Sequence, residues 1–415
     1  MTSNKNSAGP SYLEFVILVS MMMSLMALSI DAMLPALSQI GSDLNVQNAN
    51  DRQLVVSSIF LGVAVGQLFF GPLSDKTGRK PAMYMGYSLY ICGSLLSAFA
   101  NTFPMMLFGR MLQGIGISAP RAVLLALVRD LYKGRLMAQV MSFVSTVLLL
   151  IPMVAPTLGQ AILLHAGWRS IFFSFVLMAL ITLIWFALRM PETLSPENHK
   201  PFSLKRIVDT TIEIIKIRPA FGYTISIGLI SGAFLGYLNS AQQLFQEHYS
   251  LGEKFPLYFA LIALSIGLAT FLNARLVMRL GMRFLVRRSL IVILGLSTLY
   301  LGIAIMTSGH LPLWLVMAYL ISTFFCVGIL FGNQNALAME PLGHLAGIGA
   351  AIVGSLSTLI SIPLGTLIGR SYNGTAIPLI IGITVLSGLS LSVVHWAKAD
   401  SKVDNEDNDV SYSTE

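Results

Sequence analysis

Twelve long apolar runs constrain this chain more than any other feature of its sequence. Each run holds about 20 residues, enough for a helix to cross a hydrocarbon core of about 30 Å. Charged residues make up only 11% of the chain, whereas the apolar set AVILMFWYC makes up 55%. Soluble domains carry about 25% charged residues, so this chain cannot cover a water-facing surface. We therefore expect an all-α membrane protein with twelve transmembrane helices.

The runs fall into two groups of six. The longest polar interruption lies between the groups and contains an amphipathic stretch at 203–217. We expect an N-terminal six-helix bundle (1–189), a cytoplasmic linker with an amphipathic helix (190–218), a C-terminal six-helix bundle (219–397) and a disordered acidic cytoplasmic tail (398–415). The expected spans are 12–38, 52–74, 81–100, 104–127, 136–163, 168–188, 219–245, 255–277, 284–307, 312–338, 345–369 and 375–397.

Basic residues set the orientation of the spans. With the N-terminus inside, the outer loops hold only Arg52, Arg169, Lys254 and Arg370, and the cytoplasmic segments hold most of the other bases. Cytoplasmic loops of membrane proteins carry an excess of Lys and Arg, so we expect both termini in the cytoplasm. The net charge of +7 then reflects topology, and we expect no nucleic-acid partner.

The two groups of spans resemble a repeat. Loops 71–80 and 274–283 occupy matching places, and each has a base before its last glycine and another after it. Matching positions in the fifth and eleventh spans carry Pro156-x-x-Gly159 and Pro363-x-Gly365. Two parallel repeats of this kind place a substrate site near the bilayer midplane, between the halves.

One loop identifies a family. The segment from Gly71 to Lys80 reads GPLSDKTGRK and resembles the major facilitator signature G-x-L-[SA]-D-[RK]-x-G-R-[RK] between the second and third helices. Physically, its acid can pair with a base or with a helix end and favour one of two arrangements of the halves; the alternative is an ordinary basic loop. We expect a conformational latch formed by Gly71, Asp75, Gly78, Arg79, Lys80, Arg129 and Asp130.

Further segments resemble the bicyclomycin/chloramphenicol-resistance (Bcr/CflA) exporters of that superfamily. They are DAMLPAL at 31–37, the R-x-x-Q-G motif at 110–114, the R-D-x-Y motif at 129–132, and APTLG at 155–159. The last resembles the helix 5 motif of antiporters through Pro156 and Gly159, although Ile151, Ala155 and Gln160 stand where glycines are usual. The resemblance implies the major facilitator fold of two pseudo-symmetric six-helix bundles, and proton-driven export of small molecules.

Two intramembrane charges lie at similar depth. Asp31 lies in the outer part of the first span and Arg110 in the outer part of the fourth. Charges inside a membrane are costly and usually functional, so we expect a switchable pair in which Asp31 carries the proton. The alternatives are a fixed structural ion pair, or an Asp at the water edge that caps a helix kink at Pro35.

A third charge, Arg121, points to the cargo. It lies eleven residues beyond Arg110, which is about 16 Å deeper and within about 20° of the same helix face. An unpaired arginine on a cavity wall favours an anionic or carboxylate-bearing cargo, for example a siderophore. The alternatives are snorkelling toward the inner interface, and pairing with Asp130 or Glu340.

Polar and aromatic side chains complete the expected cargo site. With Arg121, the candidates are Gln113, Tyr237, Asn239, Gln242, Gln243, Asn333, Gln334 and Asn335. No glycine loop for ATP and no spacing of metal ligands occurs in the sequence, so we expect a proton gradient as the energy source, no cofactor and no metal.

The leading hypothesis is a monomeric proton-coupled antiporter of the bacterial inner membrane that exports drugs or metabolites, as in multidrug and antibiotic resistance. Its partners are then small molecules, protons and the lipid bilayer. An importer of an organic acid or nutrient on the same fold is the first alternative. A membrane-embedded enzyme would need a His cluster, an acid dyad or a Ser/His constellation, and the sequence has none at membrane depth. A sensor that binds ligand without flux is the last alternative.

Overall fold

Long helices account for most of the computed structural model, which describes residues 10–398. The first six are α1 (Tyr12–Asp31), α3 (Leu54–Thr77), α4 (Arg79–Ala98), α5 (Phe103–Leu131), α6 (Gly134–Ala166) and α7 (Trp168–Arg189). The second six are α9 (Arg218–Gln242), α10 (Phe255–Leu280), α11 (Met282–Met306), α12 (Leu313–Met339), α13 (Ala346–Arg370) and α14 (Ile377–Lys398). Apart from Lys398, the expected acidic tail lies outside the described residues.

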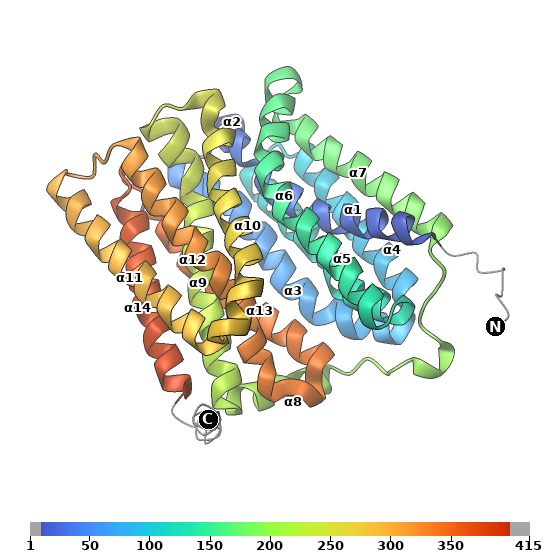
Figure 1. Cartoon of the computed structure of the whole chain (residues 1–415). Coiled ribbons are helices and arrows are strands. Elements are labelled where there is room, and N and C mark those ends of the chain that lie inside the picture. Colours follow the sequence, from blue (N-terminus) through green and yellow to red (C-terminus); the bar gives the residue numbers. More distant parts are fainter. Residues whose placement is uncertain (1–9, 399–415) are drawn as a thin grey trace, which may run out of the picture.

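The helices form two groups that follow chain order. Figure 1 shows α1 to α7, in blue to green, beside α9 to α14, in yellow to red. The two groups meet mainly through α3 against α13 and α6 against α10. No β-strand occurs between residues 10 and 398, and the expected all-α arrangement with twelve long helices is confirmed.

Eleven helical segments within the described residues are long and apolar enough to cross a membrane. The remaining long helix, α4, has 20 residues but carries two bases and three tyrosines. Its tyrosines Tyr87 and Tyr90 are buried, and the helix packs against α5 and α7. Protein neighbours therefore cover two of the three tyrosines of α4, whereas Tyr84 is exposed. The chain is a multi-pass membrane protein.

The first span is interrupted. The sequence predicts one helix over 12–38, but α1 ends at Asp31 and is followed by a 3-10 turn, η1 (Leu34–Ala36), and by α2 (Leu37–Asp43). Pro35 lies in η1 and lacks the N–H that a continuous helix needs, which corrects the expected single helix. The break places Asp31 at a helix end inside the bundle.

The two ends of the bundle carry different short segments, after which we name them. The α8 end carries α8 (Leu204–Lys216), the amphipathic helix that the sequence predicts at 203–217. Residues Ile207, Thr210 and Ile214 of α8 are buried, and the helix packs against α9 and α13. The opposite end, the η2 end, carries the 3-10 segment η2 (Ala49–Gln53).

Candidate functional site

Asp31 lies at the break in the first span. Its side chain is buried, with 6% exposed, and it makes no hydrogen bond or ion pair with any residue between 10 and 398. The carbonyl of the next residue, Ala32, packs directly on Gly159 of α6, where a Cβ atom would overlap the carbonyl oxygen. Gly159 and the buried Pro156 belong to the expected helix 5 motif, so that motif shapes the backbone beside the acid.

Arg110 ties three helices together instead of pairing with Asp31. Its guanidinium is fully buried and donates from Nε to the carbonyl oxygen of Val55 (3.2 Å) and from Nη2 to that of Ser29 (2.8 Å). Nη1 donates to Oε1 of Gln113. The expected direct pair with Asp31 is therefore not formed in this conformation, because backbone carbonyls of α1 and α3 take the guanidinium.

Gln113 supports this arrangement. It has no exposed surface, and its Nε2 donates to Oγ of Ser94 at 2.9 Å. In this conformation its amide is bonded to both Arg110 and Ser94, within the packing of α4 and α5, and its place in the cargo site stays a prediction.

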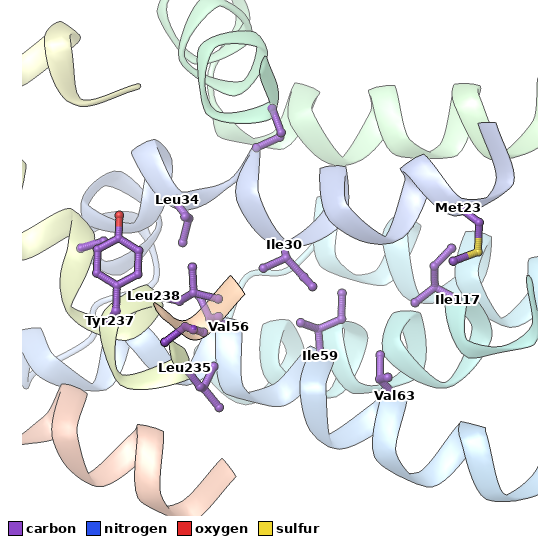
Figure 2. Close-up of a cluster of buried hydrophobic side chains, with 14 of the residues drawn as sticks. Met23, Ile30, Leu34, Val56, Ile59, Val63, Ile117, Leu235, Tyr237 and Leu238 are labelled. Atoms are coloured by element: carbon purple, nitrogen blue, oxygen red, sulfur yellow. The ribbon is translucent and has the colours of Figure 1, made fainter. Parts of the chain in front are cut away.

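Tyr237 lies between the halves, on the same side of the bundle as Asp31. Its ring stacks on Phe259 (centroids 5.8 Å apart) and contacts Phe324 (4.7 Å). Figure 2 shows it beside Leu34 of η1, in a buried apolar cluster that joins α9 to the first half. The Tyr237 hydroxyl has no hydrogen-bond partner among the described residues, and it lies within electrostatic range of Asp31.

Arg121 lies on an exposed face of α5, ten residues before that helix ends. It makes no hydrogen bond or ion pair with any described residue. Both acids that the sequence offers as partners are occupied: Asp130 Oδ2 pairs with Arg79 Nε (3.3 Å), and Glu340 Oε2 pairs with Arg283 Nη2 (3.7 Å). Ten residues correspond to about 15 Å of helix, so Arg121 lies deep in its span.

The amides of α12 have different roles. Asn333 Nδ2 donates to Oδ1 of Asn273 on α10 (2.7 Å), and Gln334 Nε2 donates to Oγ of Ser226 on α9 (2.7 Å). These two buried side chains hold the second half together in this conformation, and their place in the cargo site stays a prediction. Asn335 is exposed and is bonded to no described residue, so it remains a candidate.

Of the two amides Asn239 and Gln242 of α9, Asn239 joins the halves and Gln242 bonds within the second half. Nδ2 of Asn239 donates to Oγ of Ser57 on α3 (3.1 Å). Gln242 Nε2 is held by Gln246 and Glu247 in the π-helical segment η4 (Gln243–His248) that extends α9. Both side chains are buried in this conformation, and their expected place in the cargo site stays a prediction.

A set of contacts at the η2 end closes that end of the bundle, and we call it the η2 seal. Two ion pairs cross between the halves, Asp51 Oδ1 with Arg370 Nη2 (2.7 Å) and Arg52 Nη1 with Glu247 Oε1 (3.2 Å). Gln243, another expected cargo residue, belongs to this seal: its Nε2 donates to Oδ1 of Asn50 (2.8 Å).

Several residues of the expected latch bond to one another or to a neighbouring helix at the α8 end, within the first half. Nη1 of Arg79 donates to Oδ1 of Asp75 (2.6 Å) and to Oγ of Ser74 (2.8 Å). Lys80 Nζ donates to the carbonyl oxygen of Ala187 on α7 (3.0 Å). Two expected members lie apart in this conformation. Gly71 has open space where a Cβ would stand, and Arg129 is exposed, with no described partner.

Glu192, which no sequence motif marks, binds the backbone of the signature loop. Its carboxylate accepts four backbone N–H groups: Arg79, Lys80 and Thr193 at 2.9 Å, and Leu194 at 3.0 Å. Partial burial raises the pKa of this carboxyl group, but the four donors outweigh that effect and hold the pKa below its ordinary value. Glu192 therefore caps the first turn of α4, where the helix dipole also favours a negative charge.

Comparisons with known proteins now decide the family. The family model described as Major Facilitator Superfamily matches residues 17–366. The chain belongs to the Major Facilitator Superfamily. It is 30% identical to an uncharacterized MFS-type transporter, YdgK, of Bacillus subtilis (strain 168), over 92% of this chain and 95% of that protein. It is 27% identical to a bicyclomycin resistance protein homolog of Haemophilus influenzae (strain ATCC 51907 / DSM 11121 / KW20 / Rd), over 88% of this chain and 91% of that protein.

Another relative is the multidrug resistance protein MdtL of Escherichia coli O139:H28 (strain E24377A / ETEC), 29% identical over 88% of this chain and 91% of that protein. The fold is similar to that of solved superfamily members. The xylose transporter XylE from E. coli matches with a TM-score of 0.72 at 14% identity, over 94% of this chain and 98% of that chain. The human organic anion transporter MFSD10 matches with a TM-score of 0.68 at 17% identity, over 94% and 100%.

Membership of the Major Facilitator Superfamily makes this chain a transporter, and the expected resemblance to the Bcr/CflA exporters is confirmed by its bicyclomycin-resistance and multidrug-resistance relatives. The signature loop that suggested the family is the segment that Glu192 caps. The signature loop can be predicted from a short stretch of sequence. Glu192 lies more than 100 residues further along the chain, so only the fold reveals its contact with that loop.

Proposed function

We propose that this chain is a proton-coupled antiporter that exports small molecules by alternating access. The observation that carries the proposal is Asp31, a buried carboxyl group in a spanning helix with no bonding partner among the described residues. Ionisable groups inside a membrane are costly and mark functional sites by default. A carboxyl group takes up a proton in an apolar site and releases it when water reaches it. Asp31 is thus suited to carry the proton.

The arrangement of the halves supports alternating access. The η2 seal and the buried apolar cluster of Figure 2 close one end of the space between the halves. We propose that the η2 end faces outside and the α8 end faces the cytoplasm, with both termini inside the cell. The protein works in the bacterial inner membrane, as a monomer, and needs no cofactor beyond the proton gradient.

Arg121 supports an anionic or carboxylate-bearing cargo, either a drug or a metabolite such as a siderophore. Arg121 lies deep in the α5 span, exposed and without a described partner, while Asp130 and Glu340 bind other bases. A guanidinium can bind a carboxylate through two parallel N–H···O hydrogen bonds. The exposed Asn335 of α12 could add a neutral donor from the other half. Export, rather than import, is favoured by the similarity to drug-resistance proteins.

A transport assay tests this proposal. The purified chain is reconstituted in proteoliposomes with a pH gradient, and anionic, zwitterionic and cationic compounds are compared. Arg121→Gln is expected to abolish gradient-driven movement of anions, whereas Arg287→Gln, at an exposed arginine of α11, should leave it intact. Movement of cations only, or of anions unaffected by Arg121→Gln, would exclude the anionic cargo. Movement in the same direction as protons would favour an importer.

A further inference from the structure

Asn50 is the most heavily shared side chain in the η2 seal. Its Nδ2 donates to the carbonyl oxygens of Arg370 (2.9 Å) and Tyr372 (2.8 Å), at the end of α13. Its Oδ1 accepts from Nε2 of Gln243 (2.8 Å) in η4. One amide of the first half therefore bonds to two separate segments of the second half.

The chemistry of an amide is needed at this position. Both carbonyl oxygens require a donor, and the Gln243 amide requires an acceptor, so no side chain with a single polar character satisfies all three. Two flanking bonds hold the same site: Tyr372 Oη donates to the carbonyl oxygen of Gln243 (3.3 Å), and Gln53 Nε2 donates to Oε1 of Gln243 (3.4 Å). The three segments thus bind one another around Asn50.

The segment that receives Asn50 has an unusual backbone. Residues Gln243 to His248 form a π-helical turn, and such turns are rare and frequently lie at functional sites. Gln243 and Glu247 both lie in this turn and both bind the η2 segment, through Asn50 and Arg52. A change in register would break both contacts together.

We propose that Asn50 is a positioning residue of the transport cycle, which holds the outer side closed by joining η2 to α13 and to the π-helical turn of α9. This inference rests on the alternating access proposed above. When the outer side opens, these three hydrogen bonds break, so the strength of the Asn50 contacts sets how often the outward-open state forms. Asn50 touches no proton-carrying or cargo-binding candidate other than Gln243.

Thiol labelling tests this role without a cargo. The two native cysteines, Cys92 and Cys326, are replaced by serine, and the buried Leu238 of the cluster in Figure 2 is replaced by cysteine. A membrane-impermeant maleimide is applied to right-side-out and to inside-out vesicles. Asn50→Leu keeps the size and removes all three bonds, and Asn50→Asp replaces the donor by an oxygen that faces two carbonyl oxygens.

Both variants are expected to raise outside labelling of the Leu238→Cys reporter about tenfold or more. The matched control is Asn48→Asp, which adds the same charge in the same loop but keeps the oxygen that accepts from the Asn50 backbone N–H. It should label at the parental rate. A second reporter, Leu290→Cys in the core of the second half, should stay unlabelled in every variant.

If both Asn50 variants label the Leu238→Cys reporter at the parental rate, in right-side-out and in inside-out vesicles, the proposed role of Asn50 is overturned. Equal gains at Leu290→Cys would also overturn it, because they would indicate general loosening. An increase that occurs only in inside-out vesicles would overturn the proposed orientation and leave the Asn50 contacts as the gate, so the two failures can be distinguished.

Discussion

Gly78, in the signature loop, has a counterpart that makes its role measurable. It precedes α4 with φ +101° and ψ 162°, and Gly281 precedes α11 with φ +75° and ψ 153°. Both conformations are rarely open to residues with a Cβ, and alanine there costs about 1–3 kcal/mol in strain. At Gly78 the Cβ would also lie 2.6 Å from Oε2 of Glu192, whereas at Gly281 nothing lies within 4 Å.

The difference between the two alanine variants isolates Glu192. Displacing its carboxylate from the first turn of α4 removes a helix cap, which is worth about 1–2 kcal/mol. Gly78→Ala should therefore lower the free energy of unfolding by about 1–2 kcal/mol more than Gly281→Ala, a factor of about 5–30 in the folded-to-unfolded ratio. In a Glu192→Ala background, Gly78→Ala and Gly281→Ala should lower the free energy of unfolding by the same amount.

Equilibrium unfolding of the purified protein by SDS in mixed micelles measures these free energies. The reasoning requires the excess cost of Gly78→Ala in the parent chain and its disappearance without Glu192. Equal costs in the parent chain, or an excess that survives Glu192→Ala, would show that the Glu192 contact does not account for the glycine of the signature.

Three further predictions follow from single side chains. Because the pKa of Glu192 is lowered on folding, its contribution to stability is present above the ordinary carboxyl pKa of about 4.3 and is lost as the pH falls through the lowered value. The difference in melting temperature between the parent and Glu192→Gln should therefore persist at pH 7 and shrink in acid. A difference that stays constant with pH would contradict this. Arg110→Lys should abolish transport in proteoliposomes while the protein still elutes as a folded monomer. The reason is that an ammonium group cannot reach the carbonyl oxygens of Ser29 and Val55 together. Near-normal transport by Arg110→Lys would refute this prediction. Tyr237→Phe should change the free energy of unfolding by less than about 0.5 kcal/mol, because the Tyr237 hydroxyl has no described partner. It should nevertheless shift the pH profile of transport if that hydroxyl meets the Asp31 carboxyl during the cycle. A large loss of stability would show that the hydroxyl is bonded in the folded state.

The sequence was most informative about the helices themselves. Long apolar runs bounded by bases, glycines and prolines mark where a helix enters and leaves a membrane. Every long helix except α1 begins and ends within about five residues of its predicted span, whereas α1 ends at Asp31, before the break at Pro35. The amphipathic period of 203–217 likewise predicted α8 correctly, since one face of that helix is buried against the second half.

Contacts across distant parts of the chain could not be predicted in the same way. Asp31 and Arg110 share a depth and carry opposite charges, which suggested a pair; their helices instead approach so that Arg110 binds the carbonyl of Ser29. Amides such as Asn333 and Gln243 were predicted as cargo ligands because polar groups are costly inside a membrane. In this conformation they form hydrogen bonds between helices, contacts that only the fold reveals.

Proton coupling through Asp31 is the central claim, and lumenal pH tests it most directly. Proteoliposomes that hold a pH-sensitive dye are given a transported compound, and proton movement is recorded for the parent, for Asp31→Asn and for Asp43→Asn, an acid of α2 that pairs with Arg169. We predict cargo-dependent proton movement in the parent and in Asp43→Asn, and none in Asp31→Asn, which should still exchange cargo without a gradient. Cargo-driven proton movement that persists in Asp31→Asn would contradict the account.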